Sequence, residues 1–146
     1  MNGGIPVGIF TPIGIPKKNV ITNVGLNHVE LLLAKGAPST TGVNVSAIAL
    51  GNISAPAVGD TTLSGEISGC GLDRAWGTYY DLGNGWWEIN NTLTYSCSSA
   101  MKVNTTGNFN QTTNGVFFSG GIISDVNFGS SGDQIRIRHN FTYKEG

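Results

Sequence analysis

The chain has 146 residues, enough for one domain with its own hydrophobic core. Only 12% of the residues are charged and the formal net charge is −1, which argues against a basic nucleic-acid-binding surface. No run of 18 apolar residues occurs, so we expect no membrane-spanning helix.

Residues 1–20 form an apolar arm in which three prolines, Pro6, Pro12 and Pro16, disfavour a helix. Two interpretations stand: an edge strand of the protein's own domain, or an arm that packs on a neighbouring subunit. The start of the chain lacks the features of a signal peptide, so the protein is either made without one or numbered after its removal. The apolar side chains of this assembly arm are Ile5, Val7, Ile9, Phe10, Ile13 and Ile15.

The segment from Thr22 to Lys35 is the one good helix candidate. Thr22 or Asn23 can cap its start, and leucine and valine side chains recur at helical spacing in the residues that follow. His28 lies beside this apolar stripe without a second metal ligand nearby in the sequence, so we expect it at the surface or in a capping role. We place the β domain at residues 21–146, with its helix near 23–35.

Strand patterns repeat from Val43 onward. Short β-branched or aromatic runs are separated by turns rich in Gly, Asn, Asp and Ser, the spacing of a β-sandwich or barrel. We therefore predict an all-β, mainly antiparallel module, a β-sandwich resembling a jelly roll. The predicted strands are 43–50, 72–80, 85–96, 116–118, 122–128 and 134–143, with Gly120-Gly121 separating the fourth from the fifth.

Two of these strands have clear faces. In 85–96 the side chains of Trp87, Ile89 and Leu93 share one face, opposite those of Trp86, Glu88 and Thr92. The runs 72–80 and 85–96 flank a short loop, Asp81 to Gly85, which predicts a hairpin. The last strand alternates strictly, with Ile135 and Ile137 on one face and Arg136 and Arg138 on the other. In the turn before it, Gly132 permits positive φ and the Asp133 carboxylate can accept hydrogen bonds from nearby backbone N–H groups. Asp60 can play a similar part ahead of Leu63.

Cys70 and Cys97 are the two cysteines of the chain. Cys97 faces inward on its predicted strand and Cys70 precedes the strand that pairs with it, which makes a disulfide plausible. Such a bond would contribute roughly 3 kcal/mol and indicate an oxidising exterior, whereas the alternative is two buried thiols.

No catalytic, metal or cofactor site emerges from the residue pattern, and we expect no enzyme. His139 shares the apolar face of the last strand, where a hydrogen-bonded core or interface histidine is the simpler interpretation. The carboxylates are scattered without the spacing of a calcium loop. Three tryptophans, Trp76, Trp86 and Trp87, either pack in the hairpin, contact a second subunit or stack on a sugar.

Six Asn-x-Ser/Thr sequons offer possible glycosylation sites, a modest excess over the roughly 3 expected from composition. We expect Asn90 and Asn140 on the polar faces of their strands. We expect Asn52, Asn104 and Asn110 in loops. The six asparagines are Asn44, Asn52, Asn90, Asn104, Asn110 and Asn140.

The chain contains a series of short motifs in a fixed order. They are the segments 20–27, 48–52, 56–63 with Glu66, Arg74, 103–107, 115–118 and 131–137. Together these motifs span roughly residues 20–144 and resemble the small virion structural (tail-fibre-like) proteins of tailed phages and archaeal viruses. The resemblance implies a β-sandwich module in a homo-oligomeric virion part, without catalytic residues. The Pro-rich arm lies outside it.

The leading hypothesis is therefore a non-enzymatic virion subunit, such as a fibre, spike, tail or capsid-decoration protein, that binds copies of itself and other virion proteins. An extracellular or cell-surface filament subunit that adds its arm as a donor strand is the alternative. A carbohydrate-binding module that recognises a cell-surface glycan through its tryptophans is third.

Overall fold

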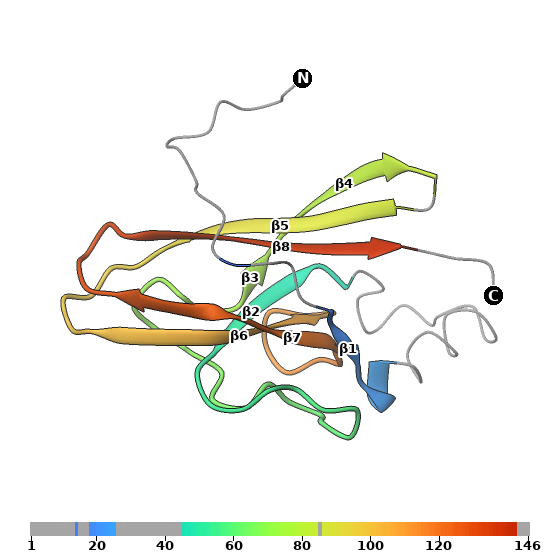
Figure 1. The fold of residues 1–146 in the computed structure, drawn as a ribbon, viewed down its shortest axis with the longest axis horizontal. Helices are drawn as coiled ribbons and strands as arrows, with labels where there is room; N and C mark the ends of the chain where they lie inside the picture. Colours follow the sequence, from blue (N-terminus) through green and yellow to red (C-terminus); the bar gives the residue numbers. More distant parts are fainter. Residues whose placement is uncertain (1–13, 15–17, 26–44, 85, 143–146) are drawn as a thin grey trace.

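A computed structural model describes residues 14, 18–25, 45–84 and 86–142. Within them the chain forms eight strands in two antiparallel sheets (Figure 1). The larger sheet has the order β1-β7-β6-β2-β3 and the smaller sheet has the order β4-β5-β8. The all-β prediction is confirmed. The strands are β1 (Val20–Ile21), β2 (Ala47–Gly51), β3 (Ala75–Trp76), β4 (Thr78–Gly83), β5 (Trp86–Thr94), β6 (Met101–Phe109), β7 (Phe117–Phe128) and β8 (Gln134–Thr142).

The two sheets pack face to face around the main hydrophobic core. The larger sheet contributes Ile48 and Val103, and the smaller sheet contributes Ile89 and Ile137 from the apolar faces of β5 and β8. The inward face of β8 predicted from its alternation is thus present. Burial of these side chains removes apolar surface from water, the main favourable contribution to folding.

A second, smaller core covers the opposite face of the larger sheet. Ala47 and Ala49 of β2 pack there against Leu63, which comes from the long loop between β2 and β3. This loop runs below the sheet in Figure 1. It is held by backbone hydrogen bonds beside β2, among them Ile67 N to Leu50 O at 2.8 Å. Both faces of β2 are therefore covered, which explains why all five of its residues are buried.

The predicted turn before the last strand is confirmed. Gly132 has φ of 99°, and the Asp133 carboxylate accepts hydrogen bonds from Gly129 N at 3.1 Å and Ser130 N at 3.0 Å. Asp60 acts similarly, since its carboxylate accepts a hydrogen bond from Ala57 N at 2.8 Å. These side chains satisfy backbone donors where the chain leaves the sheet.

Thr22 caps the predicted helix, as expected. Its Oγ1 accepts a hydrogen bond from Gly25 N at 3.1 Å, the geometry of an N-cap. The helix begins at Asn23 and its described part ends at Gly25. The remainder of the predicted helix, including His28, and the arm residues 1–13 and 15–17 lie outside the described residues.

Strand β6 was not predicted, and this is the main error in the sequence analysis. It lies between β7 and β2 in the centre of the larger sheet, although its sequence, MKVNTTGNF, is largely polar. Asn104 is consequently within a strand rather than a loop, and Asn110 follows the strand directly and is buried.

The predicted break at Gly120-Gly121 was also wrong, because β7 is one strand of 12 residues. Both glycines stay in the ladder, where Gly120 pairs with Gly107 and Gly121 with Thr106. A Cβ on Gly120 would lie 2.8 Å from Cγ of Pro56 and 2.7 Å from the Phe117 ring. The glycines therefore permit close packing, a common role of glycine inside a strand.

Candidate functional site

The β4–β5 hairpin carries the most conspicuous exposed surface of the described residues. The hairpin was predicted, but its connection is shorter than expected: β4 ends at Gly83 and β5 begins at Trp86. Asp81, Leu82 and Gly83 therefore belong to β4 and not to a loop. The ladder shifts register between Asp81 and Gly83, which places a bulge near the end of β4.

All six residues of β4 are exposed, although two are tyrosines and one is a leucine. Tyr79 is 58% exposed, even though it shares the inward face of its sheet with its partner Ile89. We call the four large exposed side chains of this hairpin the hairpin surface: Tyr79, Tyr80, Leu82 and Trp86. Figure 1 shows β4 diverging from the larger sheet at the upper edge of the molecule.

The chain reaches this surface by passing from one sheet to the other at Gly77. β3 ends at Trp76 in the larger sheet, and β4 begins at Thr78 in the smaller sheet. A Cβ on Gly77 would lie 2.6 Å from Ile89 Cγ2 and 3.0 Å from Asn90 O. The crossing therefore requires glycine. It also divides the predicted strand 72–80 into two short strands.

The three tryptophans do not form one stacking platform. Trp76 is exposed on the larger sheet, where it pairs with Ala47. Trp86 is 48% exposed on the smaller sheet. Trp87 is half-buried and stacks on Phe141 of β8, with ring centroids 5.2 Å apart and an interplanar angle of 12°. Trp87 thus anchors the turn end of the hairpin to β8, whereas Trp86 extends its exposed surface.

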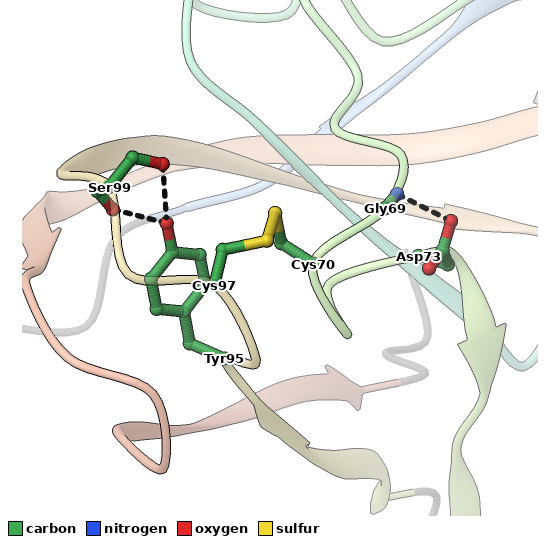
Figure 2. The surroundings of a disulfide bond; sticks show 6 residues. All are labelled: Gly69, Cys70, Asp73, Tyr95, Cys97 and Ser99. Atoms are coloured by element: carbon green, nitrogen blue, oxygen red, sulfur yellow. Dashed lines mark hydrogen bonds between the residues drawn. A yellow bond between two sulfur atoms is a disulfide. The ribbon is translucent and has the colours of Figure 1, made fainter.

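A disulfide joins Cys70 to Cys97, the pairing predicted from the sequence (Figure 2). It fixes the turn before β3 to the segment that follows β5, where Ser96 N also donates to Cys70 O at 2.8 Å. Beside it the Tyr95 hydroxyl donates a hydrogen bond to Ser99 O. The bond therefore closes a loop that contains the whole hairpin.

Arg74, directly before β3, forms a partly buried ion pair with Glu66 that the sequence did not predict. Its guanidinium donates two hydrogen bonds to the Glu66 carboxylate, at 2.8 and 2.5 Å. Further hydrogen bonds reach Gln111 O at 3.2 Å and Asn114 O at 2.5 Å, and the Arg74 Cζ lies 3.4 Å above the centre of the Phe109 ring. Charge-assisted, bidentate geometry of this kind fixes two loops to one side chain.

His139 is buried between the sheets, in the core role that its position predicted. The Thr106 hydroxyl donates to Ala49 O at 2.9 Å, so it accepts from His139 Nε2 at 3.0 Å. Nδ1 then accepts a hydrogen bond from Asn19 Nδ2 at 3.0 Å. Desolvation by burial lowers the pKa of His139 from 6.5 to about 4. The imidazole is therefore neutral at pH 7 and links β8 to β6 and to the residue before β1.

The sequons differ sharply in access to solvent. Asn52 and Asn140 are exposed, whereas Asn44 lies outside the described residues. Asn90 lies on the predicted face but is only 7% exposed, and its amide donates to Glu88 Oε1 at 2.5 Å. Asn110 is buried and its side-chain oxygen accepts from Val116 N at 2.6 Å. Asn104 is half-buried within β6, with its side-chain oxygen fully covered.

The described part of the chain has neither a metal-binding cluster nor a membrane-spanning helix. No group of three or more His, Cys, Asp or Glu side chains is placed to hold a metal ion. No helix there has the length and apolar character needed to cross a membrane.

No protein-family model matches this sequence, and no curated protein matches it at a significant level. The resemblance to virion structural proteins therefore remains an expectation. The features that bear on function are therefore the exposed hairpin, the two-sheet fold and the disulfide.

Proposed function

We propose that this protein is a non-enzymatic structural subunit that assembles with copies of itself as part of a virion. The observation that carries the proposal is β4, an edge strand with all six residues exposed and apolar side chains on both of its faces. An edge strand presents unpaired backbone donors and acceptors that can pair with another chain, and soluble monomers usually protect such edges with charges or proline. β4 has one charged residue, Asp81, and no proline.

The low charge of the chain supports the same proposal. Only 12% of the residues are charged, less than is usual for a small monomer that is solvated over its whole surface. The disulfide is compatible with a component that works outside the reducing cytosol, as the surface of a virion does.

The experiment is to measure the mass of the purified, oxidised protein by light scattering over concentrations from about 1 to 500 μM, and to image it by negative-stain electron microscopy. These concentrations cover the range of specific, weak and moderate protein associations. We expect a discrete oligomer or a regular particle. A monomer at every concentration, with no particle in the micrographs, would contradict self-assembly.

An extracellular filament subunit is the alternative assembly, and the disulfide favours it as well. In that case the strand added to a neighbouring copy would be the N-terminal arm. Deleting residues 1–17 distinguishes the two modes of assembly. Assembly through the arm is abolished by the deletion, whereas assembly through β4 is preserved.

Glycan binding is the second candidate, and Tyr80 and Trp86 favour it. Tyr80 pairs with Glu88, two residues from Trp86 on the same face of β5, so two exposed aromatic rings adjoin a carboxylate. Aromatic faces beside polar groups suit a sugar ring. A glycan array probed with wild type and Trp86→Ala tests this candidate, and it fails if no glycan binds or if binding does not depend on Trp86.

A further inference from the structure

The directions of the backbone groups in β5 can be read from its end. Tyr95 N donates to Asp133 O at 2.8 Å and Tyr95 O accepts from Gly132 N at 2.7 Å. Both backbone groups of Tyr95 therefore point toward β8. These directions alternate along an antiparallel strand, and the β5–β8 register is continuous from Trp86 to Thr94. The backbone N–H and C=O groups of odd-numbered β5 residues thus point toward β8. Those of even-numbered residues point toward β4.

This alternation identifies the free backbone groups of β4. Thr78 is paired with Asn90 and Tyr80 with Glu88, so the backbone groups of Thr78 and Tyr80 point toward β5. The N–H and C=O groups of Tyr79 and Asp81 consequently point away from β5, to the open edge of the sheet. Beyond Asp81 the bulge interrupts the ladder.

The other end of this edge is already occupied. Gly77, the next residue with the same backbone direction as Tyr79, donates its N–H to Ser46 O at 2.7 Å. The residues able to accept a new strand at this edge are therefore Tyr79 and Asp81. A short edge with two outward-facing residues can be paired symmetrically by an identical edge, which is the requirement of a twofold interface.

We propose that two copies of the chain pair antiparallel through β4, with the twofold axis at Tyr80. Tyr79 of each copy then lies opposite Asp81 of the other, and these pairs exchange four backbone hydrogen bonds. The result is one continuous six-stranded sheet of order β8-β5-β4-β4-β5-β8. The inference rests on the proposed self-assembly and specifies its geometry.

The two neighbouring twofold registers are less favourable. An axis at Asp81 would set the two Asp81 carboxylates against each other, and like charges directly opposite are destabilising. An axis at Tyr79 would require Gly77 to pair with Asp81, but the Gly77 N–H is already bonded to Ser46.

Side chains also favour the axis at Tyr80. The two Tyr80 residues form a non-hydrogen-bonded pair, the kind in which side chains approach most closely, so two exposed phenol rings cover each other. On the other face, Tyr79 lies opposite the Asp81 carboxylate of the second copy. One oxygen of that carboxylate already accepts from Gly83 N at 2.8 Å, which leaves the second free to accept from the tyrosine hydroxyl.

Cysteine cross-linking tests the register directly. In Tyr80→Cys the introduced residue lies opposite its own copy at a Cα separation of about 4.5 Å, which suits a disulfide, and both native cysteines are already paired. In Tyr79→Cys the two copies are about 8–9 Å apart by the same strand geometry, which is too far. We expect a covalent dimer on denaturing, non-reducing gels for Tyr80→Cys and none for Tyr79→Cys. The reverse result would overturn the register.

A charge variant tests the interface in solution. Tyr80→Lys sets two ammonium groups against each other at the axis, and we expect the dimer dissociation constant to rise at least tenfold by analytical ultracentrifugation. Thr92→Lys is the matched control, since Thr92 is exposed on the same face of the sheet, on β5 and away from the axis. The control should dimerise as wild type does, and both variants should keep the wild-type melting temperature of the monomer.

The outcomes separate this inference from the proposal on which it rests. If wild type assembles but Tyr80→Lys assembles equally well, the β4 pairing is wrong and self-assembly stands. If wild type is monomeric throughout and binds a foreign extended peptide at β4, both are wrong and the edge serves a different partner.

Discussion

The buried histidine predicts a specific loss of stability in mild acid. His139 is neutral in the fold, where its Nδ1 accepts a hydrogen bond from Asn19 and both bonded partners are uncharged. Protonation would place a second donor against the Asn19 amide and a charge in the core. The native state therefore resists protonation, and burial lowers the pKa of His139 to about 4.

The sign of the effect follows from proton binding. Between pH 6.5 and about 4 the unfolded chain carries a proton on His139 and the folded chain does not, so the free energy of unfolding falls as the pH is lowered. The loss begins near pH 6.5, reaches about 2 kcal/mol at pH 5 and is complete at about 3 kcal/mol below pH 4. Above about pH 7.5 this group contributes almost no pH dependence.

Urea unfolding at pH 7, 6 and 5, followed by tryptophan fluorescence, gives the free energy of unfolding. Comparison of wild type with His139→Gln isolates the pH-dependent contribution of His139. The glutamine amide can still donate to Thr106 but does not titrate. Ionisable groups that the two proteins share contribute equally to both and cancel in the difference. We expect the stability advantage of wild type to shrink by about 2 kcal/mol between pH 7 and pH 5.

The reasoning is refuted if the difference in unfolding free energy between wild type and His139→Gln stays constant within about 0.5 kcal/mol from pH 7 to pH 5. A constant difference would mean that the folded state accommodates the imidazolium. A direct measurement of the His139 titration by NMR provides the same test, since a folded-state pKa near 6.5 is incompatible with the predicted slope.

Two further perturbations concern the supports of the hairpin. Arg74→Lys should lower the free energy of unfolding, measured by urea denaturation, by about 2 kcal/mol, because an ammonium group cannot reach the Glu66 carboxylate and both loop carbonyls at once. A loss below about 0.5 kcal/mol would show that the ion pair contributes little to stability. Reduction, or Cys70→Ser with Cys97→Ser, should cost roughly 3 kcal/mol for a loop of 27 residues. An unchanged melting temperature under reducing conditions, with free thiols confirmed chemically, would contradict that expectation.

Local patterns predicted the parts of the fold that local chemistry decides. Alternation identified the inward faces of β5 and β8, and the Gly132-Asp133 pair identified the last turn. Thr22 was one of two residues predicted to cap the helix, and it does so. Each of these features depends on neighbours within a few residues in the chain, so the sequence contains the necessary information.

The errors arose where partners are distant in sequence. β6 looked like a loop because Thr105, Thr106 and Asn108 are polar, yet all three are buried. The hydroxyl of Thr106 is accommodated by Ala49 and His139, 57 and 33 residues away. Such pairings are invisible in one sequence, where a buried polar strand and an exposed polar loop read alike.

The candidate site was foreseen only in part. From the sequence alone, the aromatic run from Trp76 to Trp87 is suited to packing in the hairpin, to a subunit contact or to stacking on a sugar. The structure divides it: Trp87 packs on Phe141, whereas Tyr79, Tyr80 and Trp86 are exposed. Which of these rings is exposed depends on Gly77, where the chain passes between sheets, and no periodicity marks that point.

The position of the disulfide has a mechanical consequence for an assembled particle. β3, β4 and β5 all lie between Cys70 and Cys97. When a neighbouring copy pulls on β4, only the chain between the two cysteines can be drawn out before tension passes through the covalent bond into the rest of the fold. The bond thus limits the length of chain that each subunit can release when an assembly joined through β4 is stretched.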